Sequence, residues 1–127
     1  MSDERGVVGL PEELSLPFFA YGIFRPDEIA WSRIVSFVES TDELNIDGWQ
    51  LRERNGLPLA ALQKDARMSG NRVRFVDPRS AYELIGNVEP SGEYKWVSVI
   101  DSTGENCNLL AAKEPKTSTE PISQWSS

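Results

Sequence analysis

The order of hydrophobic and polar positions predicts a strand, a helix, a group of strands, a short helix and two final strands. Residues 16–21 form a short apolar run that ends at Gly22, which predicts a buried strand followed by a sharp turn. Pro26 and the two acidic residues after it form a helix start, and apolar residues follow at helical spacing. We therefore expect a helix over about 26–39 whose apolar face packs in the core.

The middle of the chain contains extended segments separated by turn signals. An extended segment is predicted over 44–52, with an interruption at Asp47-Gly48. Asn55-Gly56 is a strong hairpin signal, and it joins this segment to the apolar residues 57–62. Residues 72–76 alternate between polar and apolar, which is typical of a half-buried strand.

The last third of the chain predicts a short helix and two strands. Asp77-Pro78 supplies an N-cap followed by a helix-opening proline, so a helix is expected over 79–85. Residues 93–100 are rich in Tyr, Trp and Val and predict a strand. Gly104 marks a turn before a last strand over 106–112.

This order of elements favours one α+β domain: a small, mostly antiparallel β-barrel or mixed sheet with flanking helices, and not a βαβ repeat. A length of 127 residues suits a single domain. We expect a loose lead-in over 1–15, the domain over 16–113 and a flexible tail over 114–127. Trp125 within the tail is a docking anchor or an exposed aromatic residue, and we favour the second.

Composition and charge narrow the class of protein. Hydrophobic residues make up 39% and charged residues 26%, which is ordinary for a globular chain. The net charge of −7 repels phosphates, so neither nucleic acid nor an anionic membrane surface is an expected partner. The sequence shows no secretory signal and no apolar run of about 18 residues, so we expect a cytoplasmic protein outside the membrane.

Two scarce residue types limit the chemistry. The chain has no His, which excludes the usual imidazole base and His-based metal sites, and we expect no metal. The single cysteine, Cys107, cannot form an internal disulfide. It is a nucleophile or a small half-buried residue, and the second is favoured. Acid–base chemistry would therefore fall to a carboxylate, Tyr or Lys.

Several segments resemble the gamma-glutamylcyclotransferase-like family. Residues 19–26, Phe-Ala-Tyr-Gly-Ile-Phe-Arg-Pro, look like its opening signature, Tyr-Gly-Thr/Ser-Leu, which is often followed by Arg and Pro. Further segments similar to the family follow in the family's order, and together they cover about residues 16–112: 48–51, 56–58, 70–75 and 85–89, with Tyr94 five residues after Glu89.

The resemblance implies a small barrel with flanking helices and a cofactor-free enzyme. Such an enzyme releases 5-oxoproline from a small gamma-glutamyl amide or peptide by intramolecular aminolysis. Carried over by position, Glu89 would be the general base and then the general acid, and the 21–24 turn would hold the glutamyl group through backbone N–H groups. The implied substrate-binding residues are Tyr21, Gly22, Ile23, Phe24, Arg25 and Tyr94.

The residues themselves leave alternatives open. Without the resemblance, Glu89 would be a surface carboxylate after a helix, Arg25 a solvated residue at a helix start, and Tyr94 a packing residue. Glu93 is the nearest rival carboxylate. A chance recurrence of motifs on an unrelated β-rich domain would place Glu89 far from Gly22.

Several positions depart from the family pattern. Ile23 replaces the usual Thr or Ser, Gly86 replaces an Asp, and Trp96 stands where Arg is frequent. If that Asp and Arg pair in relatives, losing both leaves no orphan charge. The remaining departures are Phe24 in place of Leu, Asp27 in place of Gly and Pro90 in place of Gly. These departures support an alternative function, a catalytically inactive ligand-binding or protein-interaction module on the same fold.

Overall fold

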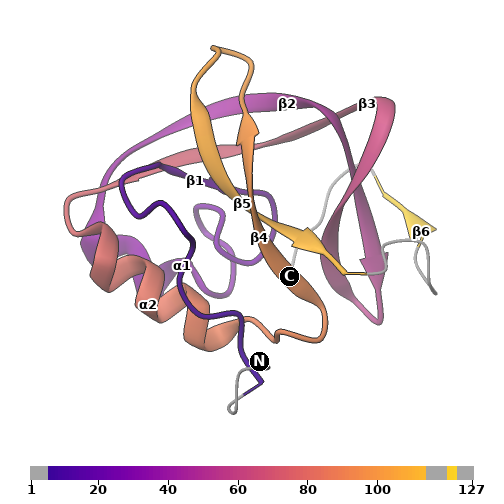
Figure 1. The fold of residues 1–127 in the computed structure, drawn as a ribbon. Helices are drawn as coiled ribbons and strands as arrows, with labels where there is room; N and C mark the ends of the chain where they lie inside the picture. The colour runs from indigo at the N-terminus through magenta and orange to yellow at the C-terminus, as the bar shows by residue number, and fades with distance from the viewer. Residues whose placement is uncertain (1–5, 114–119, 123–127) are drawn as a thin grey trace.

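A computed structural model describes residues 6–113 and 120–122 of the chain. Six strands form a single sheet in the order β4-β5-β1-β3-β2-β6, which curves into a half-barrel with a few short helices at its side (Figure 1). The predicted small α+β fold is confirmed at this level. The elements are β1 (Phe18–Ala20), α1 (Trp31–Ile34), the 3₁₀-helix η1 (Val35–Phe37), β2 (Val38–Arg54), β3 (Leu57–Phe75), α2 (Pro78–Val88), β4 (Tyr94–Ile100), β5 (Asn106–Ala112) and β6 (Glu120–Pro121).

Strand β1 lies inside the sheet between β3, to which it is antiparallel, and β5, to which it is parallel. Its side chains alternate between two hydrophobic clusters. Phe18 and Ala20 pack in the cluster that faces α2, whereas Phe19 and the following Tyr21 pack in the cluster on the other face. Burial on both faces explains why the segment is apolar at every position instead of alternating. The predicted buried strand is confirmed.

Strands β2 and β3 form a long hairpin. Asn55 and Gly56 turn the chain between them with φ of 53° and 79°, the left-handed pair that a two-residue hairpin loop requires. The predicted hairpin is confirmed, but 57–62 and 72–75 belong to one continuous strand, which ends one residue before the predicted end at 76. The interruption expected at Asp47-Gly48 is a break in register: Asp47 pairs with Arg67, and the residue after Gly48 already pairs with Leu62.

The helix expected over 26–39 is wrong. Asp27 has a φ of 69°, in the left-handed region, so the chain after Pro26 makes a turn and not a helix. Only α1 and η1 are helical, and β2 begins at Val38. The apolar spacing that predicted a helix has two buried members, Ala30 and Ile34, which pack against the core beside α2.

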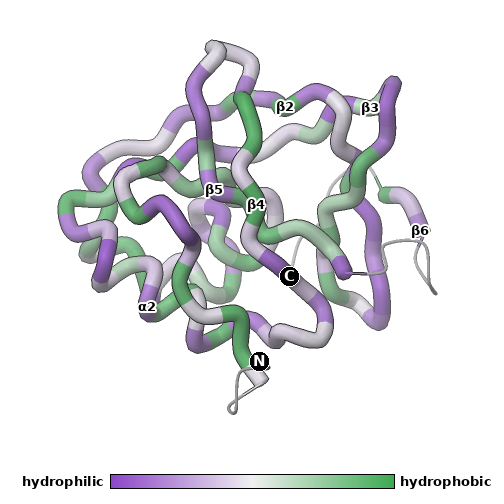
Figure 2. The backbone as a smooth tube through the Cα atoms, in the orientation of Figure 1, coloured by the Kyte–Doolittle hydropathy of each residue, from purple (hydrophilic) through white to green (hydrophobic). Residues whose placement is uncertain are grey.

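Helix α2 confirms the predicted second helix and extends it to Val88. The side chain of Asp77 accepts a hydrogen bond from the Ser80 N–H at 3.2 Å, and Pro78 occupies the first turn. Hydrophobic and hydrophilic residues alternate along the helix (Figure 2). Its apolar side includes Tyr82, whose ring packs edge-on against Phe18 and Trp96 at centroid distances of 6.2 and 5.5 Å.

Both ends of the described chain are attached to the domain. Residues 6–9, which we call the N-terminal strap, form a short antiparallel contact with the chain after α2, where Val7 lies opposite Pro90. These four residues belong to the lead-in expected over 1–15, and they form backbone hydrogen bonds with the domain. At the other end, β6 pairs with β2 at Arg52 and Glu53. Trp125 and most of the predicted tail lie outside the described residues.

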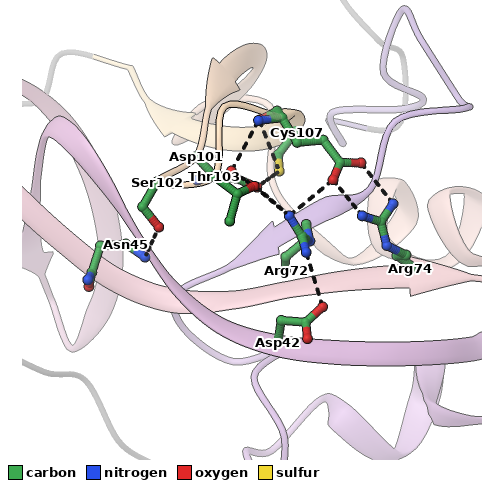
Figure 3. Close-up of polar contacts among 9 residues, drawn as sticks. Asp42, Asn45, Arg72, Arg74, Asp101, Ser102, Thr103 and Cys107 are labelled. Carbon is green, nitrogen blue, oxygen red and sulfur yellow. Dashed lines mark hydrogen bonds and ion pairs between the residues drawn. The ribbon is translucent and has the colours of Figure 1, made fainter.

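A polar network joins the β4–β5 hairpin to β3 (Figure 3). The buried Asp101 carboxylate accepts hydrogen bonds from the N–H and hydroxyl of Thr103 and from Nη1 of Arg72, the last at 3.0 Å. Arg74 makes two contacts with Glu105 in the same network. Burial alone would raise the pKa of Asp101, but the hydrogen bonds from Thr103, Glu105 and Arg72 lower that pKa to about 2.

We expect Asp101→Asn to lower the free energy of unfolding by about 3 kcal/mol, because an amide would present N–H groups to the Arg72 guanidinium inside a buried network. Asp47→Asn is the matched control, since its pair with Arg67 is exposed and worth no more than about 1 kcal/mol. Urea denaturation of both variants at neutral pH measures the difference. Equal effects in the two variants would show that the network does not stabilise the hairpin.

Candidate functional site

A small pocket opens where β1 ends. About 280 Å³ of space lies between its walls when open solvent at the mouth is included, and the centre of a water molecule could occupy only about 20 Å³ of it. Four strands, the turn after β1 and the residue that follows α2 contribute to it. The lining residues are Phe18, Ala20, Tyr21, Gly22, Ile23, Phe24, Pro58, Glu89, Tyr94 and Leu110.

The pocket brings together the two predicted halves of the site. Glu89 follows directly after α2, and the turn at Gly22 follows β1, far from Glu89 in the sequence. Both nevertheless line the same cavity. Tyr94, at the start of β4, lies with them. Residues that are distant in the chain therefore converge on one pocket, and the separation of Glu89 from Gly22 that a chance recurrence of motifs would give is not found.

Glu89 is a buried carboxylate without a counter-charge. Only 5% of its surface is exposed, and within the described residues no hydrogen bond or ion pair reaches its side chain. Burial raises the pKa of Glu89 to about 7. Near neutral pH this side chain is therefore divided between its acid and base forms, which is the property of a group that both accepts and donates a proton.

Two phenols beside Glu89 are fixed by their own hydrogen bonds. The Tyr21 hydroxyl donates to the Leu110 carbonyl, and the Tyr94 hydroxyl donates to the Pro58 carbonyl at 2.6 Å. Burial, together with the nearby charge of Glu89, raises the pKa of both phenols well above the ordinary value. Both stay protonated at neutral pH, so Glu89 is the group in this pocket that titrates there.

The turn at Gly22 depends on the absence of a side chain. A Cβ atom at this position would lie 2.4 Å from Cγ of Pro58, so only glycine lets the turn approach β3 this closely. The Arg25 N–H closes the turn by donating to the Gly22 carbonyl at 3.0 Å. Among the described backbone hydrogen bonds none uses the N–H groups of Gly22, Ile23 or Phe24, which leaves them available to an acceptor.

Arg25, one of the implied substrate-binding residues, does not line the pocket. Ile23 and Phe24 line the pocket, but Arg25 does not, and its guanidinium pairs with Glu28 at 3.6 Å. This ion pair spans the turn made by Pro26 and Asp27. The geometry gives Arg25 a role in holding the turn that follows the pocket.

Residues that the sequence did not single out complete the walls. Pro58 supplies the carbonyl that fixes Tyr94, and its only sequence signal is its place in the family-like Gly-x-Pro segment. Leu110 fixes Tyr21 through its carbonyl. Backbone acceptors of this kind carry no signature in the sequence, because any residue can supply a carbonyl.

The remaining chemical candidates lie outside the pocket. Cys107 is fully buried, and burial raises the pKa of its thiol to about 12, which keeps it protonated and agrees with a packing role. In the described parts of the chain, no group of three or more potential metal-ligating side chains occurs. No helix there combines the length and the apolar character that crossing a bilayer requires.

Comparison with known proteins gives the fold but no function. No family model and no curated protein matches the chain. Among solved structures, the chain is similar to the uncharacterized protein PH0828 from Pyrococcus horikoshii, with a TM-score of 0.62 and 20% sequence identity. The match covers 87% of this chain and 84% of that one. At this identity the likeness establishes a shared fold alone.

We expect Glu89→Gln to stabilise the protein at alkaline pH. An acid whose pKa is raised in the folded state costs stability as pH rises from its unfolded pKa through its folded pKa. Relative to wild type, the free energy of unfolding of the variant should therefore increase by roughly 2 kcal/mol between about pH 5 and pH 8. Urea denaturation at the two pH values measures it.

Glu83→Gln on the exposed side of α2 serves as the matched control, since its carboxylate is half exposed and pairs with Arg79. Its stability relative to wild type should change little over the same pH interval. A Glu89→Gln variant that behaves like this control would contradict the burial of an uncompensated carboxylate.

Proposed function

We propose that this protein is a gamma-glutamylcyclotransferase-like enzyme that releases 5-oxoproline from a small gamma-glutamyl amide or peptide. The observation that carries the proposal is the buried Glu89 carboxylate, free of counter-charge, lining the same pocket as the turn at Gly22. No other titratable side chain that lines the pocket exchanges protons near neutral pH.

The geometry supports the resemblance at positions that are far apart in sequence. The glycine of the opening signature, Gly22, packs on the proline of the Gly-x-Pro segment, Pro58. The tyrosine that follows the glutamate, Tyr94, donates to the carbonyl of that same proline. Asp27 stands where the family commonly has glycine, and its φ of 69° is the conformation that favours glycine. The glycine, the proline and the tyrosine of three separate segments thus contact one another in one local structure.

The reaction is an internal displacement. The α-amine of the substrate attacks its own γ-carbonyl carbon, the new C–N bond closes the five-membered ring, and the bond to the leaving amine breaks. Holding the folded-back conformer supplies much of the acceleration, since oriented intramolecular reactions reach effective molarities of about 10⁵ M or more. A narrow pocket with apolar walls favours such a compact conformer over an extended one.

Glu89 would move the proton in both steps. Ionised Glu89 takes one proton from the α-ammonium group, which frees the attacking lone pair, and gives that proton to the departing nitrogen. The ring nitrogen loses its second proton after the attack, and the leaving amine takes it up and departs as ammonium. A pKa of about 7 suits both roles, and general acid–base catalysis of this kind contributes about 10²–10⁴ in rate. The N–H groups of the 22–24 turn would bind the substrate carboxylate or the developing oxyanion.

The pocket also carries an observation that favours a second function. Ile23 lines the cavity at the position where the family has a hydroxyl, so the wall offers one hydrogen bond fewer to a substrate. A module that binds a small ligand without turning it over would keep the pocket and need no such hydroxyl. Calorimetric titration with glutamate, 5-oxoproline and gamma-glutamyl compounds separates binding from turnover.

We expect the purified protein to release 5-oxoproline from one or more members of a panel of gamma-glutamyl amides and dipeptides. Glu89→Gln should lower that rate by about 10²-fold or more, because it removes the proton carrier and preserves the shape of the side chain. The rate of the wild-type protein should rise with pH through about 7 as Glu89 ionises. Chromatographic detection of 5-oxoproline measures each outcome.

Glu93→Gln is the matched control, since Glu93 is the neighbouring carboxylate but lies outside the pocket lining and pairs with Arg54 at 2.7 Å. Its rate should stay within a few fold of wild type. Folded wild-type protein that releases no 5-oxoproline from any substrate in the panel would overturn the enzyme proposal, and equal losses in the two variants would overturn the role of Glu89.

A further inference from the structure

The N-terminal strap forms hydrogen bonds with the backbone at and beside Glu89. The Val8 N–H donates to the Glu89 carbonyl at 2.9 Å, and the Ser91 N–H donates to the Gly6 carbonyl at 2.8 Å. On its other side, the Glu89 N–H donates to the Ile85 carbonyl at 3.2 Å as the last bond of α2. The peptide groups on both sides of the Glu89 Cα are therefore fixed, one by the helix and one by the strap.

The strap can lie against α2 because the helix has a glycine, Gly86, at the point of contact. A Cβ atom at Gly86 would lie 2.1 Å from the Gly9 carbonyl oxygen, well inside contact distance. The Gly9 N–H donates to the Gly86 carbonyl at 3.1 Å. The indole N–H of Trp96 donates to the Gly9 carbonyl at 2.8 Å, so a side chain of β4 holds the strap from the other side. In Figure 1 the indigo N-terminal segment passes the end of α2.

These contacts account for two departures from the family pattern in one step. Gly86 stands at the position of an aspartate and Trp96 at the position of an arginine. Here both residues contact Gly9, one by leaving space for it and the other by binding its carbonyl. Val8, the next strap residue, packs against the hydrophobic cluster that includes Ile85 and Tyr94.

We propose that the N-terminal strap is a positioning element for Glu89, which fixes the backbone at Glu89 from outside the pocket and so aims its carboxylate at the turn formed by residues 21–24. Gly86 and Trp96 are the positioning residues that hold the strap in place. The catalytic consequence rests on the proposed function, whereas the effect on Glu89 itself does not.

The titration of Glu89 reports on this positioning directly. With the strap in place the carboxylate is buried, and the titratable groups that face it are the phenols of Tyr21 and Tyr94, which stay neutral. The charges of Arg54 and Glu93 act on Tyr94. Displacing the strap releases the Glu89 carbonyl, lets the side chain turn toward water and lowers the pKa of Glu89 toward the ordinary value of about 4.3.

The test is a carbon-13 NMR titration of the Glu89 carboxyl group in the whole 127-residue chain, with the signal assigned by its loss in Glu89→Gln. Gly86→Ala should lower the pKa of Glu89 by about one unit or more, because its methyl group displaces Gly9. Trp96→Phe, which keeps an aromatic ring and removes the N–H donor, should lower it by a smaller amount. Gly92→Ala is the matched control, since its Cβ would meet no described atom within 4 Å, and it should titrate like wild type.

Each outcome decides the proposal. A folded Gly86→Ala variant with an unchanged pKa for Glu89 overturns it, as does a wild-type pKa at the ordinary glutamate value. If Gly86→Ala does not fold by circular dichroism, an unchanged titration in Trp96→Phe overturns it. No substrate is needed, so a failure to release 5-oxoproline counts against the proposed function alone. If release is found, kcat for Gly86→Ala should fall and the pH profile should move to lower pH with the pKa.

Discussion

The double burial of β1 is the constraint on which the rest of the molecule depends. Three residues form the strand, and their side chains enter opposite hydrophobic clusters. Because the strand is buried, its backbone N–H and C=O groups need partners, which β3 and β5 supply on its two edges. On the face that Phe18 enters, Tyr82 of α2 packs against it. The turn after β1 therefore lies among β3, β4, β5 and the end of α2, and the pocket forms between these elements.

The pocket combines local rigidity with one energetically unfavourable group. The phenols of Tyr21 and Tyr94 are tied to carbonyls, and Gly22 is packed on Pro58. Glu89 alone lies in a low-dielectric setting without a partner, at a cost of about 3 kcal/mol when it is ionised. A domain of this size has a total stability of only about 5–15 kcal/mol, so ionisation of this one group offsets a sizeable fraction of it.

The sequence predicts the elements whose signals are local and fails where distant contacts decide. The N-cap at Asp77, the Asn55-Gly56 turn and the apolar β1 were predicted because each rests on residues next to one another. The helix over 26–39 failed because the left-handed conformation of Asp27 has no signal in apolar spacing. The site was predicted only through a resemblance, since the carbonyls that fix its phenols belong to residues of any type. The strap was not predicted, because its partner, the chain after α2, lies about 80 positions away in sequence. Nothing in the sequence indicates that Gly86 is a glycine because another segment packs on it.

The contact between Gly9 and Gly86 also restricts the order in which this sequence could have changed. While Gly9 lies against α2, no larger residue fits at position 86, and while position 86 carries a side chain, the strap cannot lie there. A lineage that lost the side chain at 86 first could then acquire the strap, but the reverse order passes through a clash. Once Trp96 also holds the strap, replacing Gly86 or Trp96 alone disturbs it. The N-terminal residues and the helix that precedes Glu89 therefore form a pair that evolution can replace together but not one at a time.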